Sequence, residues 1–405
     1  MTSLFEINAG FLPLLDSALL VVAEARGFAA EEGLKLNLVK QSSWANIRDR
    51  LAVGHFDVAH MLAPMPIASS LGLNPLNVPT IAPMALGLGG NSVTVSPALW
   101  DLLVAAGAPS DLSARAVGAA LKQVVAARAG GEKLRFGVVH PHSGHNYELR
   151  YWLAASGIHP DRDIEIVIVP PPLLPDALAR GAIDGFCVGA PWNSVAVARG
   201  VGRIATVKAA IWRSSPEKVL GLTSEWARRE PEALAALIRA VYRASIWCGD
   251  RQNLDEVAQI LAAPDYLDQP ADILMHGLSG QLMLARGEMA GVDDFFIPHA
   301  RAATFPWQSH ALWFYSQMVR WGQLGHTAEN ARIAAECYRP DLYRAALSPL
   351  GVPVPAANAK VEGALGESTP VGVTKGMLSL GPDGFFDGQV FDPDDLDRYI
   401  IAQKL

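Results

Sequence analysis

Residues 51–64, LAVGHFDVAHMLAP, decide the fold, because the stretch returns in altered form as residues 178–191, LARGAIDGFCVGAP. The two windows align without gaps and share Leu, Ala, Gly, Asp, Ala and Pro in the same order. In each window a glycine ends a helix-like stretch, and an apolar run typical of a short buried strand follows it. The pattern predicts that the chain builds one structural half twice.

The repeat extends upstream of both windows. Residues 25–28 (ARGF) precede the strand-like residues 34–39, and residues 155–158 (ASGI) precede the strand-like residues 164–169. Each half therefore alternates helix, glycine stop and strand, which is typical of an α/β lobe. We predict an α/β protein with two similar lobes that face one another across a ligand cleft.

Length and composition fit a protein with more than one lobe. The chain has 405 residues, of which 50% are hydrophobic and 18% charged, so it exceeds one typical domain and can fill large cores. No uninterrupted apolar run reaches the roughly 18 residues of a membrane span, so no membrane is expected as a partner. The net charge is −7 and no basic run occurs, which argues against nucleic acid as a direct ligand. A bound anion would have to be attracted by local groups.

The N-terminal residues carry no sign of an export signal. The first basic residue is Arg26, residues 4–8 alternate as an opening strand would, and no cleavage site or early cysteine is present. We therefore expect a cytoplasmic protein. Its cysteines are few and widely separated, which fits a reducing compartment and predicts buried apolar side chains rather than a metal site or a disulfide. They are Cys187, Cys248 and Cys337.

Three predicted helices begin where a cleft between two α/β lobes would lie. Serines at 42–43 precede a helix that stops at Gly54, residues 144–146 (GHN) open a helix that stops at Gly157, and Pro191 fits the first turn of a third. Free backbone N–H groups and the positive end of the helix dipole favour anions at such positions.

Hydrogen-bond donors occur at or near these helix starts. They are the Trp44 indole, the Asn91 amide, the His145 imidazole, the Gly189 backbone and, as a positive charge, the Lys218 ammonium. Such a set suits a small, weakly basic oxyanion. Ordinary explanations exist beside this one: lobe packing for Trp44, a helix cap for His145, and a surface ion pair with Glu217 for Lys218. Spacing alone does not bring the five together.

Several longer motifs resemble a known group of proteins. The chain resembles the nitrate and bicarbonate solute-binding proteins of ABC transporters and, equally, their cytoplasmic relatives, the NasS-type nitrate sensors. The resemblance runs from about residue 10 to residue 223 and continues more diffusely beyond. The motifs that carry it are residues 10–16 (GFLPLLD), 43–49 (SWANIRD), 59–66 (AHMLAPMP), 149–155 (LRYWLAA) and 186–193 (FCVGAPWN). It implies a two-lobed periplasmic-binding-protein-like (type II) fold with extra C-terminal helices.

The resemblance also implies which residues contact the ligand. By position in the family motifs these are Trp44, Asn91, His145, Gly189 and Lys218. The sequence departs from the family pattern at two places: Asn91 stands where nitrate binders carry Gln, and Ala190 stands where the transporter proteins often carry Glu. His140 and His142 lie close enough to His145 to compete for its role.

Ligand chemistry narrows the choice of anion. Nitrate only accepts hydrogen bonds, whereas bicarbonate carries a hydroxyl that needs an acceptor, and sulfate or phosphate needs more positive charge. The predicted site offers Lys218 and neutral donors without an evident carboxylate, which favours nitrate or nitrite over bicarbonate. A buried ion pair of this kind costs desolvation, so the neutral donors must complete the shell.

No enzyme, metal site or cofactor is expected. The chain has no nucleophile elbow, phosphate loop or zinc spacing. The acidic residues 391–397 lack the ligand spacing of a calcium loop and fit the start of a helix over residues 396–403.

We expect lobe 1 to comprise residues 1–96 and 217–405, with its C-terminal helices, and an inserted lobe 2 to comprise residues 97–216. Crossing segments are predicted near residues 92–95 and 219–223, and helices over residues 231–247 and 310–321.

The leading hypothesis is a cytosolic nitrate or nitrite sensor for nitrate assimilation. By resemblance, the ligand-free sensor would hold a NasT-type RNA-binding antiterminator and release it when the anion binds. One alternative is the nitrate or bicarbonate solute-binding component of an ABC transporter. Another is an enzyme on the same architecture, such as a pyrimidine-precursor synthase.

Overall fold

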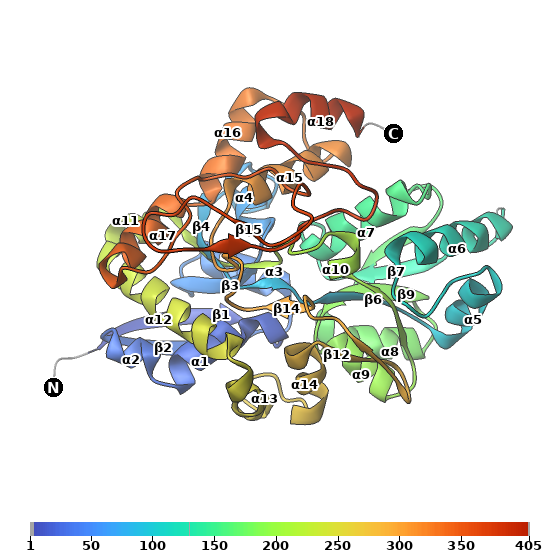
Figure 1. Ribbon diagram of the computed structural model, residues 1–405, viewed down its shortest axis with the longest axis horizontal. Coiled ribbons are helices and arrows are strands. Elements are labelled where there is room, and N and C mark those ends of the chain that lie inside the picture. Colours follow the sequence, from blue (N-terminus) through green and yellow to red (C-terminus); the bar gives the residue numbers. More distant parts are fainter. Residues whose placement is uncertain (1–3, 129, 404–405) are drawn as a thin grey trace.

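The computed structural model describes residues 4–128 and 130–403, and two five-stranded sheets form the cores of its two lobes (Figure 1). The strands of the first sheet are β1 (Phe5–Phe11), β2 (Leu34–Lys40), β3 (Val58–Leu62), β4 (Thr80–Ala85) and β11 (Lys218–Thr223). Those of the second are β6 (Asn91–Val95), β7 (Arg135–Val138), β8 (Glu165–Ile168), β9 (Gly185–Gly189) and β10 (Arg203–Val207). Their orders are β2-β1-β3-β11-β4 and β8-β7-β9-β6-β10.

The internal repeat of the sequence is a repeat of topology. β3 and β9 occupy equivalent positions in the two windows, and each pairs in parallel with an earlier strand of its own sheet, β1 or β7. Each also pairs antiparallel with a strand that arrives from the other lobe, β11 or β6. Gly54 and Gly181 both have positive φ, 76° and 68°, directly after the preceding helices, a conformation that favours glycine. The predicted pair of similar α/β lobes is confirmed.

Helices cover both sheets. Those of the first lobe are α1 (Ala18–Ala25), α2 (Phe28–Glu31), α3 (Trp44–Ala52) and α4 (Met65–Ser70), preceded by the 3-10 turn η1 (Leu15–Ser17). Those of the second are α5 (Pro97–Ala105), α6 (Ala114–Ala127), α7 (Gly144–Ala155), α8 (Leu174–Ala179), α9 (Trp192–Ala198) and α10 (Lys208–Ile211). The Ser43 hydroxyl accepts from the Asn46 N–H and the Ser143 hydroxyl from the Asn146 N–H, so serine caps fix the starts of α3 and α7.

The chain crosses between the lobes twice, over residues 86–90 and 212–217. The predicted crossing segments near 92–95 and 219–223 are wrong, because β6 and β11 are sheet strands, fully or almost fully buried, that begin directly after the crossings. The two crossings touch, since the Gly89 N–H donates to the Ser215 carbonyl at 2.9 Å. β14 (Phe296–Ile297) pairs with β5 (Leu88–Gly89) and braces them. The lobe boundaries proposed from the sequence stay a prediction.

Beyond β11 the chain forms helices and short strands that pack on both lobes. The helices are α11 (Ser224–Arg229), α12 (Pro231–Gly249), α13 (Leu254–Ala262), α14 (Ala271–Ser279), α15 (Gln308–Arg320), α16 (Ala328–Cys337), α17 (Pro340–Leu347) and α18 (Leu396–Ala402). The strands are β12 (Gln281–Ala285), β13 (Glu288–Gly291), β15 (Thr369–Pro370) and β16 (Ser379–Leu380). The predicted helices over 231–247 and 310–321 are confirmed as α12 and α15. Among the described residues, no helix is both long and apolar enough to span a bilayer.

This C-terminal part contacts both lobes: α12 packs on α1 and α16 on α4 in the first lobe, and other C-terminal segments contact the second. The hairpin β12–β13 lies against the second lobe, where Arg203 forms two contacts with the Glu288 carboxylate, at 2.5 and 2.6 Å. The last extended segment runs across the molecule (Figure 1), and the two carboxylate oxygens of its Asp387 share the hydrogen bond that the Tyr151 hydroxyl of α7 donates. Opening of the lobes therefore has to work against contacts on both sides of the cleft.

Candidate functional site

The structure brings all five predicted ligand-contact residues into one buried cluster between the lobes. Trp44 begins α3 and Lys218 begins β11, both in the first lobe. Asn91 begins β6, His145 lies in the first turn of α7, and Gly189 ends β9, all in the second lobe. Asn91 and Gly189 are direct partners in the β6–β9 ladder. The crossing topology explains this convergence, because strand ends and helix starts of both lobes meet beside the two crossings, residues 86–90 and 212–217, which we call the hinge.

A carboxylate that sequence reasoning left out lies at the centre of the cluster. The Asn91 side-chain amide donates to one Glu217 oxygen at 2.7 Å, and the Lys218 ammonium donates to the other at 2.9 Å. His145 Nε2 lies 3.2 Å from the latter oxygen. Lys218 Nζ also lies 5.4 Å from the centre of the Trp44 ring. Four of the five predicted residues are thus arranged around Glu217 or its lysine partner.

A second carboxylate holds Lys218 from the first lobe. Asp16, in η1, accepts from the Lys218 ammonium at 2.9 Å and contacts His60 Nε2 at 2.8 Å. Burial alone would raise the pKa of Asp16, but Lys218 and the His60 ring outweigh it and hold the pKa below its usual range. Burial lowers the pKa of His60, so its ring is neutral at neutral pH.

A second lysine, from α10, completes the cluster. Lys208 Nζ lies 2.8 Å from a carboxylate oxygen of Glu217 and 2.8 Å from one of Glu148. Burial, together with the neighbouring Glu217 charge, raises the pKa of Glu148 to about 8, while the pKa of Glu217 is lowered by His145 and the two lysines in spite of its burial. At neutral pH the two lysines therefore face two ionised carboxylates, Asp16 and Glu217, and one protonated acid.

These carboxylates correct the sequence-based picture of the site. The site was expected to lack a carboxylate, but Asp16, Glu148 and Glu217 all contact its lysines. Lys218 does pair with Glu217, as the alternative explanation of a surface ion pair predicted, but its side chain is fully buried. The signals lay in the quoted motifs: Asp16 closes GFLPLLD and Glu217 precedes Lys218. Lys208 and Glu148 had no such signal.

Several polar atoms of the cluster have no partner within the described residues. Trp44 Nε1, both ring nitrogens of His145 and Asn91 Oδ1 are buried and make no hydrogen bond there. Burial lowers the pKa of His145 to about 3, so its ring is neutral and offers one N–H. A buried donor without an acceptor costs about 1–3 kcal/mol. The unpartnered N–H groups of Trp44 and His145 fit a site where an anion supplies the missing acceptors, whereas Asn91 Oδ1 is itself an acceptor.

His140 and His142 do not share the place of His145. His142 Nδ1 contacts the Tyr147 hydroxyl at 3.0 Å, and His140 Nδ1 accepts from the His142 backbone N–H at 3.0 Å. Of the three histidines, His145 is the one that contacts Glu217.

Glu148 makes the stability of the protein depend on pH in a testable way. In the unfolded chain it ionises near 4.5, whereas the folded chain keeps the proton until about pH 8, because of burial. Between these values the folded state holds the extra proton, so rising pH favours unfolding by up to about 1.4 kcal/mol per pH unit. We expect the unfolding free energy of the wild type, relative to Glu148→Gln, to fall as the pH rises from about 4.5 to about 8. Urea unfolding at several pH values measures this, and parallel profiles would contradict it.

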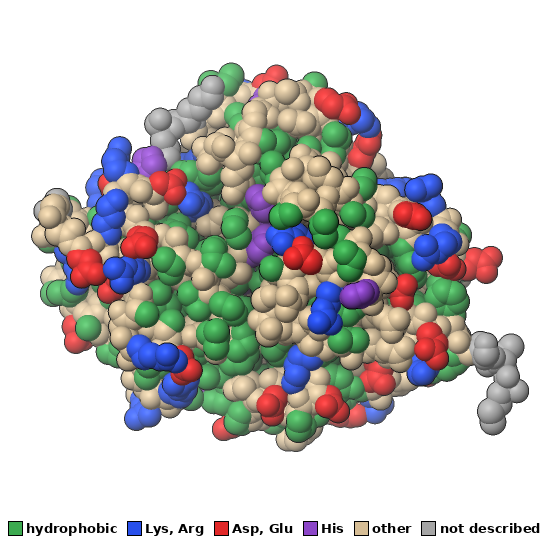
Figure 2. All heavy atoms as spheres, turned by 180° about the vertical axis from the view of Figure 1, so that it is seen from behind, with side chains coloured by type: hydrophobic (Ala, Val, Ile, Leu, Met, Phe, Trp, Pro, Cys, Tyr) green, Lys and Arg blue, Asp and Glu red, His purple; other side chains and the backbone are tan. Residues whose placement is uncertain are grey.

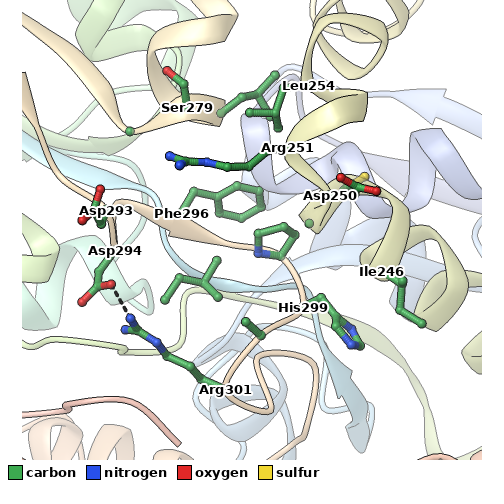
Figure 3. Close-up of a pocket in the computed structure, with 17 residues that line it drawn as sticks. Ile246, Asp250, Arg251, Leu254, Ser279, Asp293, Asp294, Phe296, His299 and Arg301 are labelled. Atoms are coloured by element: carbon green, nitrogen blue, oxygen red, sulfur yellow. Dashed lines mark ion pairs between the residues drawn. The ribbon is translucent and has the colours of Figure 1, made fainter. Parts of the chain in front are cut away.

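A separate cavity lies beside β14 (Figure 3). It has a volume of about 350 Å³ and is bounded by the end of α12 and by residues 293–301. On its wall Asp294 pairs with Arg301 at 2.7 Å. None of the five predicted residues lines it. On the surface shown in Figure 2, basic and acidic side chains are interspersed, so the positive charge at the cluster comes from the two buried lysines.

Comparison with known proteins agrees with this architecture. The NMT1-like family model matches residues 4–262. The chain is 32% identical to the nitrate/nitrite binding protein NrtA of Synechococcus elongatus, over 98% of this chain and 86% of that protein. It is 29% identical to the bicarbonate-binding protein CmpA of a Synechococcus species, over the same shares.

A solved structure extends the match to three dimensions. The periplasmic nitrate-binding protein NrtA from Synechocystis superposes with a TM-score of 0.87 at 28% identity, over 99% of both chains. The ligand-binding component of an ABC-type import system from Staphylococcus aureus, at 17% identity and a TM-score of 0.65, shares the fold. The chain belongs to the NMT1-like family and has its two-lobed, periplasmic-binding-protein-like α/β fold.

Proposed function

We propose that the chain binds a small planar oxyanion, nitrate or nitrite, between its lobes, and that it is not an enzyme. The observation that carries this is the buried cluster with donors from both lobes, Trp44 and Lys218 on one side and Asn91 and His145 on the other. The names of the relatives, nitrate/nitrite binding and bicarbonate-binding proteins, support an anion of this size.

Closure of the lobes is the physical consequence of such a site. Its side chains are almost fully buried, so an anion enters only when the lobes separate about residues 86–90 and 212–217. An anion that contacts donors of both lobes binds the closed form better than the open form and shifts the population toward it. Ligand binding is thereby converted into a change of shape.

The carboxylates make bicarbonate a real competitor. Asp16 and Glu217 supply acceptors for a ligand hydroxyl, which the sequence-based argument against bicarbonate did not include. Nitrate and nitrite remain the proposed ligands, because the unpartnered groups Trp44 Nε1 and His145 supply hydrogen-bond donors.

Lobe closure on the anion fits two biological roles. The finer proposal is a cytosolic sensor whose closure releases a NasT-type RNA-binding antiterminator and so controls nitrate assimilation genes; the motif resemblance supports it. The second candidate is the solute-binding component of an ABC transporter. The likeness over 99% of the chain to a periplasmic nitrate-binding protein favours that candidate.

Calorimetric titration with nitrate, nitrite, bicarbonate and sulfate tests the ligand. We expect saturable binding of nitrate or nitrite, weaker binding of bicarbonate, and none of sulfate, which would add two negative charges to a cluster whose lysines and carboxylates already balance, where nitrate adds one. A folded, dialysed sample that binds neither nitrate nor nitrite would contradict the proposal. A pull-down with an antiterminator of this class, with and without nitrate, then separates the two roles: nitrate-dependent release supports the sensor.

A further inference from the structure

The Glu217 carboxylate occupies the donors that the oxyanion would use. Asn91 Nδ2 donates to it at 2.7 Å and Lys218 Nζ at 2.9 Å, and His145 Nε2 lies at 3.2 Å. All three residues were predicted as ligand contacts from motifs that do not include Glu217 in that role. One side chain of the protein therefore takes hydrogen bonds from two of the five predicted residues, Asn91 and Lys218, and lies beside a third, His145.

The fit of this carboxylate is close. It packs against the backbone of Gly144 at the start of α7, where a Cβ atom would clash with Glu217 Oε2. The 12-residue helix α7 presents its positive end to the carboxylate at this point. Lys208 Nζ closes the other side at 2.8 Å. Glu217 is thus bound as an anion would be bound, by an ammonium pair, an amide and a helix start.

A carboxylate and nitrate or nitrite have matching chemistry. Each is a planar group with delocalised negative charge whose oxygens only accept hydrogen bonds. Two such anions cannot share one set of buried donors without strong repulsion. We propose that Glu217 is a built-in competitor for the oxyanion, which must leave Asn91 and Lys218 before the ligand can take them. This inference rests on the proposed function, and it adds the residue that sets the affinity.

Glu217 can keep its contact with Lys208 after it leaves Asn91 and Lys218. Its Lys208 contact lies on the side away from Lys218 and is shared with Glu148, which is protonated at neutral pH. Trp44 Nε1, unpartnered and buried, remains as a further donor for the incoming anion. Only the molecules in which Glu217 has left Asn91 and Lys218 can bind the anion, so the apparent affinity is lowered in proportion to their fraction of the population. A protein with this lowered affinity responds to higher concentrations of the ligand.

Nitrate titration of Glu217→Gln tests the proposal, with Glu362→Gln as the matched control. Glutamine keeps the size of the side chain but removes its charge, so we expect at least about tenfold tighter nitrate binding by Glu217→Gln. Glu362 is also a fully buried carboxylate, but its partners are Ser309, His310 and Lys360, none of which belongs to the cluster around Lys218. Glu362→Gln should bind nitrate within about threefold of the wild type, because the charge near Lys218 is unchanged.

The outcomes separate this inference from the proposed function. Wild-type binding with equal or weaker binding by folded Glu217→Gln overturns the competitor role and leaves oxyanion binding in place. If neither the wild type nor folded Glu217→Gln binds nitrate, nitrite or bicarbonate, the competitor role and the proposed function are both overturned. Should Glu217→Gln not fold, a crystal structure of the wild type with nitrate decides: we expect nitrate on Asn91 and Lys218 with Glu217 displaced. Nitrate bound elsewhere, with the 2.7 Å contact between Asn91 and Glu217 intact, overturns the proposal.

Discussion

Replacement of Lys218 by methionine should abolish nitrate binding and cost about 3–5 kcal/mol of unfolding free energy, because it leaves buried carboxylates without their cation. The Lys218 ammonium is fully buried and lies 2.9 Å from oxygens of both Asp16 and Glu217. The destabilisation should shrink toward about pH 4, since the pKa of Asp16, no longer held down, rises and the folded chain takes up the proton. Urea unfolding at two pH values and calorimetric titration measure the two effects.

Trp44→Phe is the matched control, since it removes a donor but no charge. Trp44 Nε1 has no acceptor within the described residues, so its loss should change the unfolding free energy by less than about 1 kcal/mol. A hydrogen bond to a charged acceptor contributes about 1.5–3 kcal/mol, so nitrate affinity should fall by about 10- to 150-fold. Wild-type affinity in Lys218→Met would show that the anion binds elsewhere.

The fold could be predicted from the sequence because the evidence for it is local and repeated. The window at 51–64 and its echo at 178–191 each carry a helix end, a glycine and an apolar strand, and β3 and β9 lie where the windows place them. The crossing segments were misplaced by a few residues, because residues 91–95 (NSVTV) carry three polar side chains and give no local sign that they form a buried strand. Their ladder partners come from distant parts of the chain.

The partners in the site could be predicted only in part. Motif position identified Lys218, but the structure was needed to show that Glu217 shares its environment. In a regular strand neighbouring side chains point to opposite faces, whereas Glu217 lies in the irregular crossing just before β11 and contacts the same cluster. Lys208 and Glu148 approach from α10 and α7, and no spacing in the sequence links these helices to β11.

Four aromatic side chains connect this crossing to the C-terminal part. Phe385 stacks on Trp212, with ring centres 4.7 Å apart, and lies 5.4 Å from Tyr151 and 6.0 Å from Trp313. Trp212 opens the crossing that ends at Glu217, Tyr151 belongs to α7, and Trp313 belongs to α15. The cluster thus joins the hinge, the second lobe and the C-terminal helices through one ring.

Phe385→Ala should therefore lower the unfolding free energy by about 3–5 kcal/mol, the usual cost of removing a buried aromatic ring. Because Trp212 loses its stacking partner, amide hydrogens of residues 212–217 should also exchange faster with solvent. Phe386→Ala is the neighbouring control: Phe386 is half-buried and meets Tyr151 at 6.4 Å, so it should cost about 1 kcal/mol and leave exchange in the crossing unchanged. Equal effects of the two substitutions would mean that the C-terminal segment contributes packing but does not restrain the hinge. A selective effect of Phe385 would mean that the C-terminal segment helps to set how readily the lobes open.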